Sequence, residues 1–197
     1  MFNEQCSLVK CLRTAHNAGM KLDAPQITQA ALELLQAEGL DGLAMRTLAA
    51  KLGVRASALY WHVADKDRLY ALMAAQFYAS AYTTADQAGS ARAWLEALGR
   101  QFRAVLLEYR DSARLCAIAP PDEPRTPEIA GRITARLVAL GMAETKALGA
   151  IASVLALTLG WVVYEQSRTM HEHLAGMMDL DTTFSNGLVA LLDGLDM

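Results

Sequence analysis

Cysteine is scarce in this 197-residue sequence, and its positions exclude the sites that cysteine usually builds. Cys6, Cys11 and Cys116 form an odd set, with neither a CxxC pair nor the spacing of zinc ligands. We therefore expect reduced thiols, as is typical of a cytoplasmic protein. Cys116 is open to two interpretations, a small buried hydrophobic side chain or a regulatory thiol.

Motifs of catalysis are also missing. The sequence has no glycine-rich phosphate loop, no nucleophile–base motif and no pair of carboxylates within an apolar helical stretch. His171, Glu172 and His173 suggest a metal site, but histidines two positions apart on a helix point in different directions. We expect them to be solvated where a helix ends. The sequence thus predicts neither an enzyme nor a bound cofactor or metal ion.

Two further patterns are lacking. No window alternates apolar and polar residues between turn signals, so we expect no β-sheet. The first twenty residues contain no continuous apolar run, because Glu4, Lys10, Arg13 and His16 interrupt them. We expect no signal peptide there, and interpret residues 1–20 as a flexible extension or a misassigned upstream start.

Positive charge is not in excess either. The net charge is −3, so the protein as a whole is not a cationic nucleic-acid binder, although residues 1–70 are less acidic than the rest. Hydrophobic residues make up 53% of the chain, which is high for a soluble monomer. This content predicts apolar surface that a second subunit or a ligand covers.

Helical periodicity dominates what remains and predicts an all-α fold. Asp23, Pro25 and Gln26 combine an N-cap, a first-turn proline and a capping amide, and Gly39 ends the helix that they begin. Asp65 caps a longer helix that we expect to link two parts of the molecule. Further helices are predicted near residues 94–110, 112–118, 126–141, 147–164 and 184–195.

Residues 147–164 carry no charge and approach the length of a transmembrane helix. Small and polar residues dilute the run, Glu165 follows at once, and no basic cluster flanks it. Ala152, Ala156 and Gly160, spaced by four, permit close helix approach. We therefore expect a core or dimer helix, which the last amphipathic helix joins in a two-fold four-helix interface.

The most informative stretch runs from Arg46 to Val63. It predicts a short helix, a turn at Gly53, where the left-handed conformation costs glycine little, and a second helix from Ala56 to His62. Two short helices around a glycine turn are typical of the helix-turn-helix, whose second member enters the DNA major groove.

The end of this stretch carries a closer resemblance. Leu59-Tyr60-Trp61-His62-Val63, followed by Asp65-Lys66-Asp67-Arg68-Leu69, resembles the DNA-binding domain of TetR-family regulators, most of all the tetracycline-repressor branch. The resemblance is dense over residues 22–72 and looser around 102–111 and 158–160. It implies an all-helical homodimer with a helix-turn-helix domain at residues 21–67 and a ligand-binding and dimerisation domain at residues 68–197.

The resemblance also implies roles for individual residues. Arg46 resembles the family's guanine-reading arginine; the alternative is an exposed helix arginine without a base contact. Trp61 or Tyr60 is open to a packing role, and Lys66 to that of a solvated charge. The predicted DNA-binding residues are Arg46, Ala56, Ser57, Ala58, Tyr60, Trp61, His62 and Lys66.

The expected ligand pocket departs from the tetracycline-repressor pattern. Where those repressors hold a drug–magnesium complex with histidine, asparagine and other polar groups, this sequence has Tyr82, Leu98 and Cys116, and Phe102 alone matches. We therefore expect an apolar or aromatic effector, with core packing as the alternative for each residue. The predicted ligand-binding residues are Phe77, Tyr82, Trp94, Leu98, Phe102, Cys116, Trp161 and Tyr164.

Together these features predict a ligand-responsive, dimeric regulator, expected to be a repressor released from a palindromic operator by a small molecule. The alternative is a helical small-molecule-binding protein without a DNA role. The intact Tyr60-Trp61-His62 run and Lys66 favour the regulator.

Overall fold

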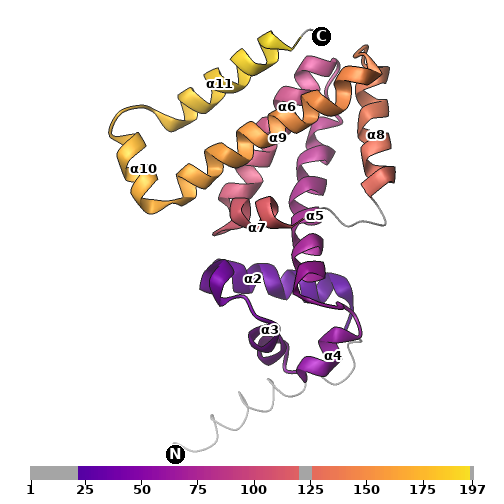
Figure 1. The fold of residues 1–197 in the computed structure, drawn as a ribbon, viewed down its shortest axis with the longest axis vertical. Helices are drawn as coiled ribbons and strands as arrows, with labels where there is room; N and C mark the ends of the chain where they lie inside the picture. The colour runs from indigo at the N-terminus through magenta and orange to yellow at the C-terminus, as the bar shows by residue number, and fades with distance from the viewer. Residues whose placement is uncertain (1–21, 120–125, 196–197) are drawn as a thin grey trace, which may run out of the picture.

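A computed structural model describes residues 22–119 and 126–195, which contain helices and no strand. Figure 1 shows a small group of helices, α2 to α4, below a larger group that ends with α11, and α5 runs from one into the other. The helices are α2 (Ala24–Gly42), α3 (Met45–Leu52), α4 (Ala56–Tyr60), α5 (Lys66–Ala85), α6 (Ala91–Leu107), α7 (Ser112–Ile118), α8 (Thr126–Ala139), α9 (Glu144–Gln166), α10 (Arg168–Ala175) and α11 (Leu180–Gly194). The all-α prediction is confirmed, while the predicted extension at residues 1–20 lies outside the described residues.

Helix α2 begins as its sequence predicts. The Asp23 carboxylate accepts a hydrogen bond from the Gln26 amide at 2.9 Å. Gly39 breaks the helix with a φ of 73°, and one further helical turn follows up to Gly42. Ile27 and Leu35 are fully buried in the core, and α2 packs against α3, α5 and α7, so it braces the small group against the rest of the molecule.

Helices α3 and α4 form the expected pair around Gly53, which takes the left-handed conformation with a φ of 69°. The prediction that the second helix reaches His62 is wrong, because α4 ends at Tyr60. Beyond it, the His62 and Val63 amides both donate to the Leu59 carbonyl, which tightens the chain into a turn. That turn buries Val63 completely.

Helix α5 joins the two groups, and its N-cap, Asp65, accepts a hydrogen bond from the Arg68 amide at 2.7 Å. It then packs along α6, which Ser90 caps in the same way. The predicted extension of α6 to Arg110 is wrong, because the helix ends at Leu107. The chain turns there through Asp111, which has the left-handed conformation at a φ of 56°.

Asp111 also forms a second connection between the two groups. Its carboxylate accepts a hydrogen bond from the Leu40 amide at 3.0 Å, and the Arg110 amide donates to the Gln36 side chain at 2.7 Å. Arg114 contacts Asp41 at 3.4 Å and pairs with Asp111 as well. The C-terminal turn of α2 is therefore held against the turn before α7.

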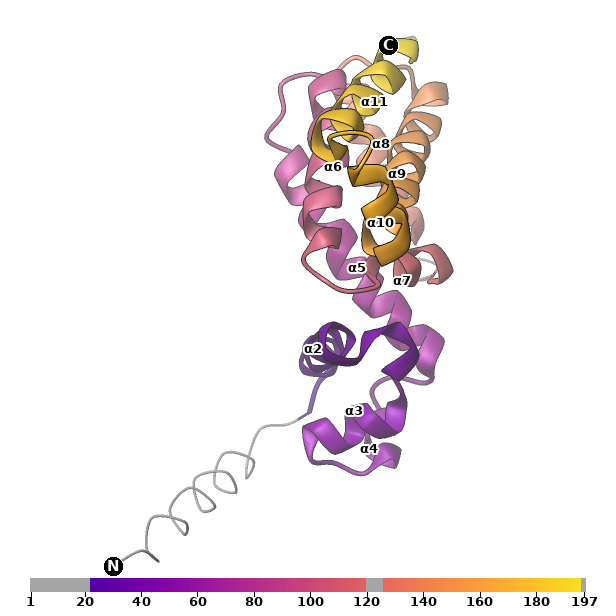
Figure 2. The ribbon, with the colours of Figure 1, turned by 90° about the vertical axis from the view of Figure 1, so that its left-hand side faces the viewer.

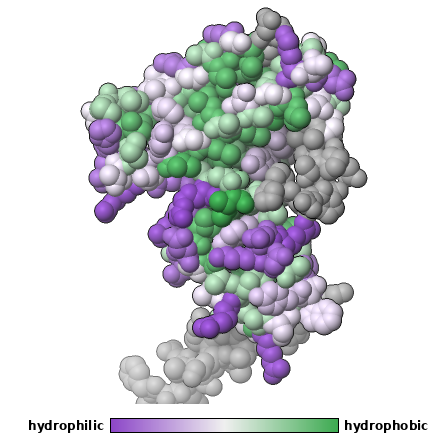
Figure 3. Space-filling view, in the orientation of Figure 1, coloured by the Kyte–Doolittle hydropathy of each residue, from purple (hydrophilic) through white to green (hydrophobic). Residues whose placement is uncertain are grey.

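Helix α9 leaves much of its apolar surface uncovered. It is the one helix in the described ranges that is long and apolar enough to cross a membrane, and a third of its most apolar window is buried. Leu148 and Tyr164 are 59% and 48% exposed, and Ala152, Ala156 and Gly160 lie exposed between them. Figure 3 shows apolar residues gathered over the larger group, where Figures 1 and 2 place α9 and α11 side by side.

We predict that Gly39→Ala destabilises the protein by roughly 1–2 kcal/mol, the cost of the left-handed conformation for a residue with a Cβ. That Cβ would also lie 2.8 Å from the Asp111 carboxylate. Urea unfolding measures the loss. Gly89→Ala is the matched control, since its Cβ meets nothing within 4 Å. Equal stability of the two variants would contradict a strained joint at Gly39.

Candidate nucleic-acid interface and effector site

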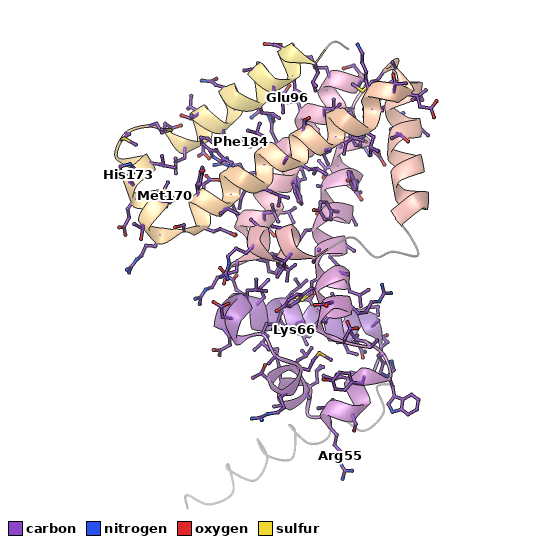
Figure 4. All side chains as sticks on the ribbon, viewed as in Figure 1. Arg55, Lys66, Glu96, Met170, His173 and Phe184 are labelled. Atoms are coloured by element: carbon purple, nitrogen blue, oxygen red, sulfur yellow. The ribbon has the colours of Figure 1, made fainter. Side chains whose placement is uncertain are left out.

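At the α4 end of the small group, most of the predicted DNA-binding residues are exposed to solvent. Ser57 and His62 are exposed, and Ala56 and Ala58 are half-buried. Leu59, which follows Ala58, is fully buried. Leu59 thus anchors α4 to the core with its opposite side open. Figure 4 shows this end farthest from the larger group, with Arg55 directed away from the molecule.

Trp61 and Tyr60 bury little in the single chain. Trp61 is 88% exposed and Tyr60 is 51% exposed. Large aromatic side chains are usually covered unless they serve a contact, so these values weigh against a packing role for either residue. Both rings therefore lie largely uncovered at the surface of the small group.

Two basic residues of the predicted set occupy helix starts. Arg46, the second residue of α3, is exposed, and α3 is held by Thr47, whose hydroxyl accepts a hydrogen bond from the Ala44 amide at 3.1 Å. Lys66, the first residue of α5, places its ammonium 5.1 Å from the centre of the Tyr70 ring. This cation–π contact orients a charge that remains exposed.

The predicted ligand residues divide among several places. Trp94, Tyr82, Tyr78 and Phe102 form a continuous aromatic stack, with ring centroids 6.1, 6.4 and 4.9 Å apart in that order. Leu98 is fully buried on α6 between Trp94 and Phe102. Phe77 instead contacts Tyr109, with ring centroids 5.2 Å apart.

Tyr78 is a member of the stack that sequence reasoning missed. Its spacing of four residues from Tyr82 on one helix was the available signal. Burial raises the pKa of Tyr78, with the nearby Cys116 thiol as a further cause, and raises the pKa of Tyr82 to about 12. Both phenols are therefore neutral hydrogen-bonding groups at physiological pH.

Cys116 also lies beside this stack, on α7. Its side chain is 6% exposed, and burial raises the pKa of the thiol to about 12. The thiolate is the reactive form of cysteine. Between the two interpretations of Cys116, the structure favours the small buried hydrophobic side chain.

The last two predicted ligand residues lie on α9, away from the stack. Trp161 packs on Phe184 of α11 with ring centroids 6.2 Å apart, and its indole nitrogen has no hydrogen-bond partner among the described residues. Tyr164 is 48% exposed. Trp161 and Tyr164 therefore lie apart from the other six predicted ligand residues, which are on α5, α6 and α7.

A cavity of about 580 Å³ opens elsewhere, between α6, α9 and the turn that joins α10 to α11. Arg103 lies in it and donates hydrogen bonds to both Glu165 oxygens, at 2.9 and 2.5 Å, and to Asp181 at 2.6 Å. Its guanidinium also lies 4.8 Å from the Phe184 ring, and the Glu165 bond raises its pKa. These charges satisfy one another, so the cluster ties three helices together.

The histidines considered as metal ligands lie in α10, with His173 in its last turn, as expected for solvated residues near a helix end. His171, Glu172 and His173 are exposed, and Figure 4 shows His173 at the edge of the molecule. In the described part of the chain, no group of three His, Cys, Asp or Glu side chains is placed to hold a metal ion.

Comparisons with known proteins agree with this arrangement. Residues 27–73 match the model for bacterial regulatory proteins of the tetR family, and residues 83–177 match the tetracyclin repressor-like C-terminal domain. The class A tetracycline repressor from transposon 1721 of Escherichia coli is 32% identical, over 89% of this chain and 91% of that protein.

Solved structures show the same similarity. A single-residue variant of TetR from Acinetobacter baumannii AYE, in complex with minocycline, has a TM-score of 0.75 and 34% identity, over 88% of this chain and 96% of that one. BioQ with its double-stranded DNA operator has a TM-score of 0.65 and 29% identity, over 89% and 98% of the two chains.

We predict that Cys116 resists thiol reagents in the native protein. With a pKa of about 12, roughly one thiol in ten thousand is ionised at pH 8. Ellman's reagent should therefore react slowly with native Cys6→Ser/Cys11→Ser protein and rapidly after unfolding in urea. A native rate close to that of the unfolded protein would revive the regulatory-thiol interpretation.

Proposed function

The chain belongs to the tetR family of bacterial regulatory proteins, and we propose that it represses transcription as a homodimer bound to a palindromic operator. A small, largely apolar or aromatic effector releases it. The observation that carries the proposal is the exposure of Tyr60 and Trp61, at 51% and 88%, on a small domain built around a helix-turn-helix. As a DNA-binding regulator, the protein acts in the cytoplasm.

The proposed interface combines two kinds of contact. Arg46 and the start of α4, Ala56 to Ala58, face the base edges, where small side chains allow close approach and contact with thymine methyl groups. Tyr60, Trp61, His62 and Lys66 contact phosphates and fix the register of the domain on DNA. We place the boundary between this domain and the larger one at residue 67, within the first turn of α5.

Dimerisation in this proposal covers the open face of α9 together with α11. Leu148 and Tyr164 supply apolar area, while the exposed Ala152, Ala156 and Gly160 let a second helix approach closely. Two copies then form a four-helix interface. The reading helices of the dimer dock roughly 34–36 Å apart, one turn of B-DNA.

The effector in this proposal binds at the aromatic stack. Within the stack, Trp94 and Phe102 are fully buried, while Tyr78 and Tyr82 are partly exposed and carry neutral hydroxyls. Such a site suits an aromatic ligand with a few polar atoms. Trp161 and Tyr164 were predicted as ligand residues, but their positions on α9 fit a role near the dimer face better.

Two helices, α5 and α7, connect the aromatic stack to the small domain that carries the recognition helix α4. Helix α5 carries Tyr78 and Tyr82 near its end and Lys66 at its start. Helix α7 carries Cys116 beside the stack, and the turn before it holds the C-terminal turn of α2 through Asp111 and Leu40. An effector that repositions either helix changes the separation of the reading helices, in proportion to its differential affinity for the two states.

We predict that the protein binds the promoter DNA next to its own gene selectively and in a salt-dependent manner. Arg46→Ala should lose about tenfold or more in affinity per half-site, with weaker sequence selectivity, because a bidentate guanine contact is worth roughly 1–3 kcal/mol. Fluorescence anisotropy with labelled DNA measures both effects. Arg92→Ala, a charge loss in the larger domain beside Asp193, is the control.

The experiment tests selective DNA binding by the intact protein separately from the base contact of Arg46. Absence of selective binding by the intact protein, there or on any other DNA, would exclude the regulatory function and favour a helical ligand-binding protein. Unchanged affinity and selectivity of Arg46→Ala would exclude a base contact by Arg46 and leave the function standing.

We also predict that Trp61 dominates fluorescence quenching by iodide. Trp61 is 88% exposed, Trp94 is 1% exposed, and Trp161 is half-buried. Trp61→Phe should therefore remove most of the quenchable emission, and operator DNA should protect the wild-type signal. Quenching that persists in Trp61→Phe, or that operator DNA leaves unchanged, would contradict the placement of Trp61 in the interface.

A further inference from the structure

We propose that Arg55 reads a guanine in each operator half-site and is a principal determinant of operator sequence. This inference rests on the proposed DNA-binding function and adds to it a residue outside the predicted set. It concerns the side chain immediately before the reading helix α4.

The backbone directs Arg55 outward. After the left-handed turn at Gly53, Val54 packs against the core, and the next residue faces the other way. Arg55 is extended, with φ −75° and ψ 144°, and its side chain makes no capping hydrogen bond, although its carbonyl accepts one from the Ala58 amide at 2.9 Å. Figure 4 shows the side chain at the far end of the small domain, pointing away from the protein.

The reading helix itself offers little means of recognising guanine. Its first residues are Ala56, Ser57 and Ala58. Methyl groups contact the thymine methyl, and a serine hydroxyl bonds with several bases without distinguishing them strongly. Residues at the N-terminal end of a recognition helix contact the base edges, so the long side chain at that end is the one placed to discriminate.

The charge environment supports an acceptor supplied by DNA. Lys51 of the same domain is paired with Glu33 at 3.0 Å, and Lys66 lies over the Tyr70 ring. The Arg55 side chain makes no ion pair or hydrogen bond with another described residue. Its guanidinium therefore presents a planar fork of donors, which matches O6 and N7 of guanine and suits a base edge better than an ammonium group does.

The experiment compares intact wild-type protein with Arg55→Lys and Arg55→Ala on a randomised operator library, followed by titration of single-base variants at several salt concentrations. Wild type should require guanine at two symmetric pairs of positions, one attributed to Arg46 and one to Arg55. Both Arg55 variants should lose one of these two requirements, by on the order of tenfold to a hundredfold per position, and keep the other requirement and their remaining base preferences. Lysine should preserve the salt dependence, because it keeps the charge without the fork.

Lys51→Ala serves as the matched control, since it removes a charge from the same domain at a paired position. It should leave every base preference intact. A uniform loss of affinity in Arg55→Ala, with a shallower salt dependence and no relaxed position, would assign Arg55 to a phosphate and overturn the proposal. Wild-type protein that selects no sequence would instead overturn the proposed function itself.

Discussion

Helix α5 packs into both domains within one continuous hydrophobic core, and both domains depend on that sharing. Leu69 and Met73 are buried in its first turns, which pack against α2, while Phe77 and Ala81 are buried farther along, where α5 packs against α6 and α7. Twenty residues of α-helix span roughly 30 Å without a joint. A rotation of α5 at its stacked tyrosines is therefore also a displacement of the small domain, because no flexible linker absorbs it.

The joint between Gly39 and Asp111 limits which displacements are available. Both residues have positive φ, and the Asp111 carboxylate fits against Gly39 only because that position has no Cβ. The contact ties α2 to α7, whereas α5 ties α4 to α6. A domain held at two points turns about the line between them, so in the proposed function an effector at the aromatic stack favours one defined motion of the small domain.

Local chemistry made much of this fold predictable from the sequence. Asp23 and Asp65 cap the helices they were expected to begin, and Ser90 caps α6 in the same way, since capping depends on a side chain and an amide three residues away. Helix ends were harder, because α4 and α6 stop where tertiary contacts, the burial of Val63 and the turn at Asp111, outweigh periodicity.

The DNA-facing surface was easier to predict from the sequence than the aromatic stack, because local contacts define the first and tertiary contacts define the second. The proposed DNA-facing surface comes from one short stretch of sequence, so that stretch predicts it. Arg55 was not in the predicted set, because the role proposed for it rests on the exposure of its side chain and on the small residues that follow it. The aromatic site is assembled from α5, α6 and α7. Its membership depends on which face of each helix turns inward, and that separates Phe77 from its neighbour Tyr78.

Because the chain has no excess of positive charge, the proposed function depends on dimerisation through the open face of α9. Phosphate neutralisation supplies essentially all non-specific affinity, and with a net charge of −3 this chain draws it from a few basic residues of the small domain. One domain alone therefore binds weakly in the proposed function. Joining two copies makes the second half-site encounter intramolecular at high effective concentration, so selectivity follows from two weak readers held at a fixed separation. In the proposed function, apolar surface on α9 and base-reading arginines on the small domain are thus two parts of one requirement, because neither yields a selective regulator without the other.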